Sequence, residues 1–353
     1  MSRCFIIAEA GVNHNGDDDL AIRLVDIAAD AGADAVKFQT FSAEKLVQEG
    51  AATAEYQARQ TGETDQFALL KRLEISQELH HRLIARCAER SIEFMSTPFD
   101  PEAADFLVGL GMSRIKIPSG ELTNLPFLAH LASLGRPLIL STGMGDMAEV
   151  EAAVAVIRAA VERTTPTVPL ADRLSILHCT SNYPAAAEDV NLLAMRSIAD
   201  RTGLPVGYSD HTSGGAVAIA AVALGAATIE KHFTLDRNLP GPDHKASLEP
   251  AELAMMIADI RNVERALGDG IKRPRPAELP VRALVRRSLA TRVNLPAGHR
   301  LRECDITFLR PASGLPPAEF ERVLGQPLKR AVQAAQVLTL DDVEPKTIVN
   351  GAA

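Results

Sequence analysis

Residues 205–232 read Pro-Val-Gly-Tyr-Ser-Asp-His-Thr-Ser-Gly-Gly-Ala-Val-Ala-Ile-Ala-Ala-Val-Ala-Leu-Gly-Ala-Ala-Thr-Ile-Glu-Lys-His and contain one complete β–α–β unit. Short β-rich runs at 205–207 and 228–232 are separated by an Ala-rich helical pattern over 215–224. Each run leads into charged residues and histidine. A strand, a helix and a second strand in this order predict two parallel strands joined by a crossover helix.

The same alternation covers the first three quarters of the chain. We expect further strands at residues 5–8, 35–39, 93–96, 114–117, 137–140 and 175–178, and helices that include 20–31, 77–90 and 149–161. Eight alternating β and α units predict a closed (β/α)8 TIM barrel rather than an open sheet. Residues 42–74 interrupt the spacing after the second strand and are expected to form a long loop over the barrel mouth.

The periodic pattern ends near residue 268 and predicts three parts for this α/β chain. They are a catalytic barrel over 1–268, a linker over 269–286 and a small, mostly-β domain over 287–353. The linker is Pro-rich and basic, with Lys-Arg-Pro-Arg-Pro at 272–276, which is typical of a semi-rigid spacer. Within the small domain, residues 295–306 and 332–343 echo each other weakly, which indicates a pseudo-symmetric fold.

Composition restricts the classes of partner. The formal net charge of −8 argues against nucleic acid or an anionic membrane, so an anionic substrate needs a local cluster of Lys or Arg. The four cysteines are scattered, which argues against a disulfide framework and against a Cys-based zinc site. No apolar stretch approaches the ~18 residues that span a bilayer, and the run at 5–8 is too short for a signal peptide. We therefore expect a cytoplasmic protein.

Polar residues follow every expected strand at its carboxyl end, where a (β/α)8 barrel has its active site. Lys37 and Lys116 lie in otherwise apolar strands, so each needs a buried carboxylate or a bound anion. Either they pair with Glu9 or Glu121, or they grip a small substrate with several negative charges. Hydroxyl groups that suit phosphate oxygens follow other strands, at Thr97, Ser119, Ser141 and Ser209. No Walker or dinucleotide motif is present, so a small phosphorylated acid is favoured over a nucleotide.

His211 and His232 follow the last two strands, which are neighbours in a closed barrel. Two imidazoles without a cysteine, with positions left open for water and substrate, fit Mn²⁺, Mg²⁺ or Co²⁺ better than structural zinc. The alternative is that both are ordinary core histidines. We expect the histidines at 80 and 81 to be solvated on a charged helix and that at 178 to be hydrogen-bonded in the core, and the pattern leaves those at 244 and 299 undecided.

With these residues in view, the chain resembles the sialic acid synthase (N-acetylneuraminate synthase) family over essentially its whole length. The motifs that carry the resemblance are Ile-Ala-Glu-Ala-Gly-Val-Asn-His-Asn-Gly at 7–16, Ala-Val-Lys-Phe-Gln-Thr at 35–40, Lys-Ile-Pro-Ser-Gly-Glu at 116–121, Tyr-Ser-Asp-His-Thr at 208–212, Ile-Glu-Lys-His-Phe-Thr at 229–234 and Gly-Pro-Asp-His at 241–244. Phe-Leu-Arg-Pro at 308–311 resembles a motif of the family's C-terminal antifreeze-like (SAF) domain.

The resemblance implies a role for each candidate residue. Glu9 would be the acid/base group, while Lys37 and Asn182 would hold the carboxylate of phosphoenolpyruvate. Its phosphate would lie among Lys116 and the four hydroxyl residues, and Gln39 would join the substrate-binding set. The two histidines would ligate a metal, usually Mn²⁺. The residues implied for the acceptor sugar are Glu121, Tyr183 and Asp243, with Arg310 at its N-acyl group. The resemblance also implies a homodimer in which each tail caps the other subunit's barrel.

The expected reaction condenses phosphoenolpyruvate with N-acetylmannosamine and water to give N-acetylneuraminate and phosphate. Residues 241–247 also occur in relatives that act on diacetamido sugars, so the alternative is a legionaminic-acid-type synthase using 2,4-diacetamido-2,4,6-trideoxymannose. More remote alternatives are a Schiff-base aldolase on the same barrel and a non-catalytic sugar-binding protein. Two segments depart from the family pattern: residues 180–183, and Ala334-Ala335, where relatives carry a Lys-Gly turn.

Overall fold

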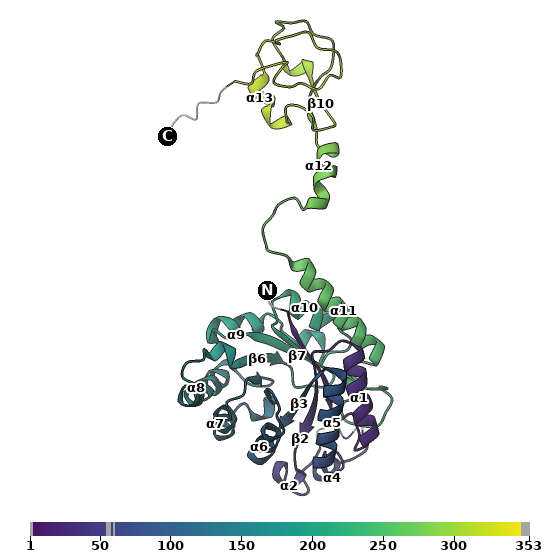
Figure 1. Cartoon of the computed structure of the whole chain (residues 1–353), viewed down its shortest axis with the longest axis vertical. Coiled ribbons are helices and arrows are strands. Elements are labelled where there is room, and N and C mark those ends of the chain that lie inside the picture. The colour runs from purple at the N-terminus through teal and green to yellow at the C-terminus, as the bar shows by residue number, and fades with distance from the viewer. Residues whose placement is uncertain (1–2, 54–57, 59–60, 347–353) are drawn as a thin grey trace. The chain divides into compact units, whose positions relative to one another are not determined.

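The computed structural model describes residues 3–53, 58 and 61–346. The chain divides into two compact units, Met1–Gly268 and Asp269–Ala353 (Figure 1). None of the described helices is long and apolar enough to cross a membrane.

The first unit is built around eight parallel strands, which confirms the predicted (β/α)8 barrel. The strands are β1 Phe5–Gly11, β2 Ala35–Thr40, β3 Glu93–Pro98, β4 Ile115–Ile117, β5 Leu138–Ser141, β6 Leu174–Cys179, β7 Val206–Asp210 and β8 Thr228–His232. Their hydrogen-bonded order is β3-β2-β1-β8-β7-β6-β5-β4, and β3 lies against β4 where the barrel nearly closes. Each strand lies close to the residues expected from the sequence.

Helices surround the strands, and most of those between strands begin at a side chain that caps the first turn. Asp17, Ser76 and Asp100 accept backbone N–H groups at the starts of α1 (Asp18–Asp30), α5 (Gln77–Arg90) and α6 (Pro101–Gly109). Asp146 forms a capping box with Glu149 at the start of α8 (Met147–Thr164). The barrel helices are α1 Asp18–Asp30, α5 Gln77–Arg90, α6 Pro101–Gly109, α7 Leu125–Ser133, α8 Met147–Thr164, α9 Ala194–Thr202, α10 Ala216–Ala223 and α11 Pro250–Leu267. Short 3-10 turns lie at Ser119–Glu121, Leu170–Asp172, Ala187–Asp189 and His244–Ala246.

The strands carry two kinds of layer on the inside of the barrel. A small apolar cluster consists of Ile7, Ala35, Met95, Ile139 and Leu177, with Phe5 packed against it. Side chains two residues apart on a strand point to the same face. The residues two positions further along are therefore the next inward layer, and all but one of them are charged or carry a hydroxyl: Glu9, Lys37, Thr97, Ser141 and Cys179. The strand pattern thus places a polar layer directly after the apolar cluster, toward the carboxyl ends of the strands.

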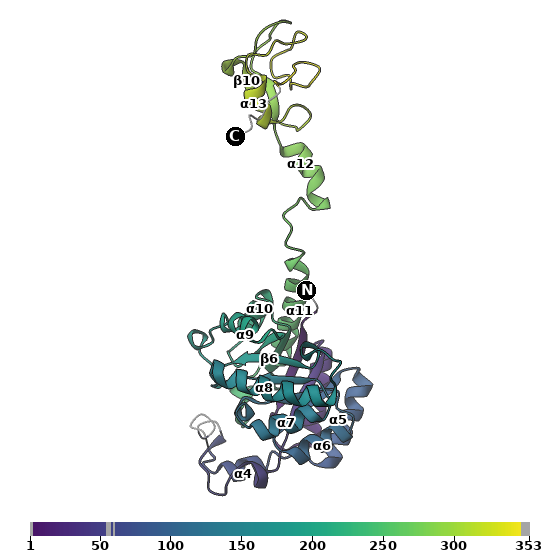
Figure 2. The same cartoon turned by 90° about the vertical axis from the view of Figure 1, so that its left-hand side faces the viewer.

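The insertion after β2 contains helices and is not a plain loop, which corrects the expectation for 42–74. Its helices are α2 Ala43–Leu46 and α4 Gln66–Lys71. Residues 54–57 and 59–60 of this segment lie outside the described part of the chain. Figure 1 shows α2 and α4 at one end of the barrel, and Figure 2 shows α4 there from a second direction.

The second unit begins with a more ordered segment than the expected spacer. A 3-10 turn at Pro276–Glu278 leads into α12, Leu279–Val285. Strand β9, Ser288–Thr291, pairs antiparallel with β10, Ile306–Leu309, and short turns at Glu303–Asp305 and Pro317–Glu319 precede β10 and α13, Phe320–Val323. The two echoing segments contact each other, because Leu295 and Val332 exchange both backbone hydrogen bonds at 2.9 Å. A small antiparallel domain with its own apolar core is therefore present, as expected for the SAF type.

Candidate active site

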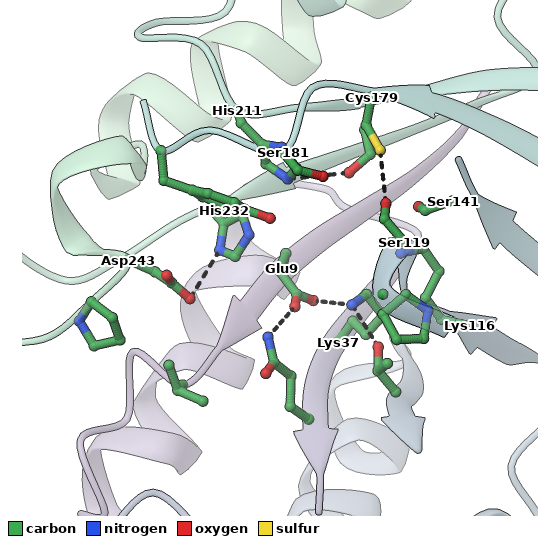
Figure 3. A pocket seen from close by; sticks show the side chains of 18 of the residues that line it. Glu9, Lys37, Lys116, Ser119, Ser141, Cys179, Ser181, His211, His232 and Asp243 are labelled. Atoms are coloured by element: carbon green, nitrogen blue, oxygen red, sulfur yellow. Dashed lines mark hydrogen bonds and ion pairs between the residues drawn. The ribbon is translucent and has the colours of Figure 1, made fainter. Parts of the chain in front are cut away.

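A cavity of about 480 Å³ opens at the carboxyl ends of the barrel strands. Most of the residues selected from the sequence line it: Glu9, Lys37, Gln39, Thr97, Lys116, Ser119, Ser141, Tyr183, Ser209, His211, His232 and Asp243. Figure 3 shows the glutamate and the two lysines close together, with both histidines on the neighbouring side. The barrel thus brings together side chains from all eight strands or the loops that follow them.

Three selected residues do not line this cavity. Glu121 is half-buried in the turn after β4, where it accepts a hydrogen bond from Asn124 Nδ2 at 2.7 Å. Asn182 is exposed, and its Oδ1 accepts the backbone N–H of Tyr183 at 3.1 Å. Arg310 belongs to the second unit, at the end of β10, and is exposed there.

Cys179 and Ser181 also line the cavity, although the sequence pattern did not predict them there. The thiol of Cys179 lies 3.2 Å from Ser119 Oγ and accepts the backbone N–H of Gly143 at 3.1 Å. A Cβ added at Gly143 would come within 2.5 Å of Ser181 Oγ, so this turn approaches the β6 loop very closely. The alternation of side chains along β6 could have identified Cys179. It lies two residues after the inward-facing Leu177 and therefore also faces the inside of the barrel.

Two lysines and two glutamates form a buried ionic cluster at the floor of the cavity. Lys37 Nζ lies 2.7 Å from Glu9 Oε2 and 3.6 Å from Glu230 Oε2. Lys116 Nζ lies 3.1 Å from Glu230 Oε1, which also accepts the hydroxyl of Ser209 at 2.8 Å. The lysines are therefore paired with carboxylates, and the second partner is Glu230 and not Glu121. Glu230 is the main residue of the cluster that sequence reasoning left without a role.

The two glutamates have opposite pKa shifts. Burial raises the pKa of Glu9 to about 7, because the attraction of Lys37 does not fully offset the loss of hydration. Burial also acts to raise the pKa of Glu230, but Lys116 and Lys37 outweigh it and hold that pKa well below its usual range. Glu9 is thus able to gain or lose a proton near neutral pH, while Glu230 stays charged. Such a division suits one acid/base group beside one fixed anion.

His211 and His232 lie side by side at the ends of β7 and β8, with ring centroids 5.5 Å apart. His211 Nδ1 donates to the carbonyl oxygen of Thr180 at 2.7 Å, which leaves Nε2 as its lone-pair nitrogen. His232 Nδ1 is buried without a hydrogen-bond partner among the described residues and lies 4.0 Å from Asp243 Oδ2. Burial is the main cause that lowers the pKa of both rings, so both are neutral.

These features fit the two-histidine metal site expected from the sequence. Neutral imidazoles are the form that binds a metal, and His232 Nδ1 is an orphaned buried nitrogen. Across the described ranges, no group of three or more His, Cys, Asp or Glu side chains is arranged to hold a metal ion. A cation bound here would therefore take its remaining ligands from water and substrate oxygens.

The other histidines are mostly structural, and one expectation is wrong. His80 is buried and not solvated: its ring contacts Thr40 Oγ1 at 2.8 Å and the carbonyl oxygen of Ser76 at 2.7 Å. The helix α5 turns this residue toward β2, whereas its neighbour faces solvent. His178 is hydrogen-bonded to Val190 O at 2.7 Å, as expected. His244 is buried against Thr234 Oγ1 at 2.7 Å, and His299 pairs with Asp305 at 2.8 Å.

Comparison with known proteins now identifies the family. Residues 24–272 match the NeuB family and residues 286–344 match the SAF domain. The chain belongs to the NeuB family. The expected resemblance is therefore confirmed, including its C-terminal domain. NeuB relatives include synthases of sialic and legionaminic acids. The chain is accordingly an enzyme of the sialic acid synthase type, a carbon–carbon bond-forming transferase.

The relatives differ in which sugar acid they make. The chain is 49% identical to the N,N'-diacetyllegionaminic acid synthase of Legionella pneumophila, covering 97% of this chain and 95% of the relative. It is 46% identical to the Campylobacter jejuni enzyme of that name, covering 92% and 96%. A crystal structure of an N-acetylneuraminic acid synthetase from Leptospira borgpetersenii serovar Hardjo-bovis, in complex with citrate, is 35% identical with a TM-score of 0.69, covering 79% and 90%. For this NeuB protein the legionaminic alternative is thus better supported than the N-acetylneuraminate expectation.

Proposed function

We propose that this NeuB protein condenses phosphoenolpyruvate with 2,4-diacetamido-2,4,6-trideoxymannose and water, giving N,N'-diacetyllegionaminic acid and phosphate. The observation that carries this proposal is near full-length identity of 49% and 46% to two synthases of that product. N-acetylneuraminate synthesis from N-acetylmannosamine is the second candidate, supported by the 35% identical structure.

Phosphoenolpyruvate is proposed to bind over the ionic cluster. Lys116 with the hydroxyls of Thr97, Ser119, Ser141 and Ser209 holds its phosphate, and Lys37 holds its carboxylate. Charged hydrogen bonds to phosphate and carboxylate are the strongest available to these side chains. Ser181 is a better candidate than Asn182 for the second carboxylate donor, because Ser181 lines the cavity and Asn182 does not. Gln39 Nε2 lies 3.3 Å from Glu9 Oε1 and would orient it.

The acceptor is proposed to bind with its aldehyde carbon above Glu9. C3 of phosphoenolpyruvate attacks this carbon: the C=C π electrons form the new C–C bond, the aldehyde C=O π bond opens, and its oxygen takes a proton from Glu9. Positive charge then develops at C2, where the charged Glu230 stabilises it. Water adds at C2 and loses one proton to Glu9. The resulting tetrahedral intermediate then forms the C2 ketone as its C–O bond to phosphate breaks, and the remaining hydroxyl proton leaves with phosphate. A divalent cation on His211 and His232, with Mn²⁺ expected and Mg²⁺ or Co²⁺ as alternatives, would supply Lewis acidity toward the aldehyde oxygen.

The remaining roles concern the sugar and the assembly. Tyr183 and Asp243 line the cavity and are proposed to contact acceptor hydroxyl or amide groups, with Glu121 at its edge. Arg310 is proposed to hold an N-acyl oxygen, because its planar fork offers two parallel donors. The assembly would be a homodimer in the cytoplasm, with each tail capping the partner's barrel. No nucleic acid or membrane partner is proposed.

Release of inorganic phosphate from phosphoenolpyruvate tests this function directly. The purified full chain should release phosphate in the presence of the diacetamido sugar and, more slowly, of N-acetylmannosamine. EDTA should abolish turnover, and Mn²⁺ should restore it. A faster rate with N-acetylmannosamine would favour the second candidate. Borohydride inactivation in the presence of pyruvate, with a covalent adduct on Lys37 or Lys116, would instead support a Schiff-base aldolase.

A further inference from the structure

One part of the cavity is apolar, in contrast to its ionic floor. Five side chains form it, and we refer to them as the apolar wall: Val12, Leu69, Leu70, Leu73 and Phe99. They belong to a separate hydrophobic cluster that also includes Leu46 and Phe41. The leucines at 69 and 73 are 4% and 5% exposed, so they are held in place and are not free to turn away.

The helix α4 is capped at its start, and the residue after its end packs closely against the barrel. Asp65 Oδ1 accepts the backbone N–H of Phe67 at 2.9 Å, which caps the start of the helix. At its other end the carbonyl oxygen of Arg72 approaches Gly16 so closely that an added Cβ would lie 2.5 Å from it. Phe99 packs edge-on against Phe41 with centroids 5.8 Å apart. These contacts hold the side chains of the wall in place.

The position of the reacting groups in the ionic cluster determines which end of the acceptor can contact the apolar wall. The aldehyde carbon must lie at the ionic cluster, where Glu9 and the two lysines are. The opposite end of the same carbon chain, C6, is directed away from that cluster. From the insertion, the only polar side chain that lines the cavity is Gln66, within the described residues. A hydroxyl pressed on the wall would lose its hydration without gaining a partner, whereas a methyl group would gain apolar contact.

We propose that the apolar wall receives the C6 methyl group of a 6-deoxy mannosamine and selects such acceptors over their 6-hydroxy counterparts. This inference rests on the proposed function and adds the residues that distinguish a methyl from a hydroxymethyl group at C6. Leu70, on α4, and Leu73, two residues after this helix ends, are its specificity-determining side chains, since both line the cavity. An apolar site discriminates modestly against one added hydroxyl, so a preference of roughly 10- to 100-fold in kcat/KM is expected.

The test compares two acceptors that differ only at C6: 2,4-diacetamido-2,4,6-trideoxymannose and 2,4-diacetamido-2,4-dideoxymannose. Phosphate release gives kcat/KM for each sugar at saturating phosphoenolpyruvate. The wild-type chain should favour the 6-deoxy sugar by the stated factor. Leu70→Asn and Leu73→Asn keep the approximate shape and add polar groups, so the preference should fall toward one while KM for phosphoenolpyruvate changes little. The ratio of two sugars on one enzyme preparation cancels any loss of folded protein.

Lys71→Gln is the matched control, on the same helix as Leu70. Lys71 is exposed and bonds Glu44 and Glu74 at 2.8 and 3.1 Å, and it does not line the cavity. Its substitution should leave the preference unchanged. Equal rates with both sugars in the wild-type chain, or a preference that survives both Leu→Asn changes, would overturn the inference and leave the proposed function intact. No phosphate release with any mannosamine would instead overturn the proposed function.

Discussion

Lys231 Nζ lies 2.9 Å from Asp210 Oδ2, and both side chains are completely buried. The two residues pair across β7 and β8, and each immediately precedes a histidine of the candidate metal site. The other carboxylate oxygen, Asp210 Oδ1, accepts the backbone N–H and the hydroxyl of Thr212. Because neighbouring side chains on a strand point to opposite faces, this pair ties the strands together behind His211 and His232.

Replacing one partner of this ion pair should destabilise the barrel more than replacing both partners. Lys231→Met leaves the Asp210 carboxylate buried without its cation, which costs roughly 3–5 kcal/mol of unfolding free energy. Lys231→Met combined with Asp210→Asn removes that charge and should recover part of the loss. Urea denaturation of the three proteins gives the comparison. A double variant no more stable than the single one would contradict this assignment.

Glu9→Gln keeps the shape of the side chain and removes its ability to transfer a proton. We expect kcat to fall by roughly 100-fold or more, with little change in KM for phosphoenolpyruvate. Lys116→Ala should behave differently and mainly raise that KM, because it removes a charged partner of the phosphate. Steady-state kinetics of both variants separates the roles. A near-normal kcat for Glu9→Gln would show that its assigned role is wrong.

His14 makes the barrel sensitive to acid. Burial lowers the pKa of His14 to about 4, and its Nδ1 accepts the backbone N–H of Gly16 at 3.1 Å. The unfolded chain takes up this proton below about pH 6.5, whereas the folded chain does not until about pH 4. Stability is therefore lost as pH falls from 6.5 to 4, by on the order of 3 kcal/mol at most.

His14→Asn isolates this effect, because the amide oxygen can still accept the Gly16 N–H but does not titrate. The difference in unfolding free energy between pH 7 and pH 4.5 should be smaller in His14→Asn than in the wild-type chain. His244, whose pKa burial also lowers to about 4, remains in both proteins and accounts for part of the residual slope. Identical slopes in the two proteins would rule out His14 as a contributor.

Ala335 adopts a φ of 60°, in the left-handed region that costs a residue with a Cβ about 1–2 kcal/mol. It lies where the sequence departs from the family's Lys-Gly turn. Ala335→Gly removes that strain but makes the unfolded chain more flexible, so a net gain of roughly 0.5–1 kcal/mol is expected. Ala334→Gly is the control, because that residue is not in this region. Thermal unfolding should show a gain for the first variant only.

The barrel was predictable because strand periodicity and polar strand ends are local signals. Lys37 and Lys116 were recognisable for the same reason: a charge in an apolar strand requires a partner. Which carboxylate supplies that partner depends on the closure of the barrel, and no local pattern distinguishes Glu230 from Glu121. Asn182 and Ser181 differ by one position in an irregular loop, where no period assigns a side. His80 was misjudged because charged neighbours on α5 concealed the face it shares with Leu83 and Cys87.

The proposed swapped dimer can be tested by complementation, because two variants that are inactive alone should regain activity when they form mixed dimers. In the proposed dimer each site combines one subunit's barrel with its partner's Arg310. Glu9→Ala and Arg310→Ala proteins should each be nearly inactive. After dissociation and random reassociation, half of the dimers are mixed, and each mixed dimer has one doubly damaged site and one intact site. About a quarter of wild-type phosphate release should therefore return.

The same mixture gives the opposite result if each tail caps its own barrel. Every site then keeps one of the two lesions, and mixing restores nothing. Mass spectrometry of the intact assemblies must verify that mixed dimers have formed, since failure to exchange would also give no activity. Two Glu9→Ala preparations mixed in the same way provide the control for refolding, and they should stay inactive. Verified mixed dimers without activity would refute the swap, because a mixed dimer with swapped tails must contain one intact site.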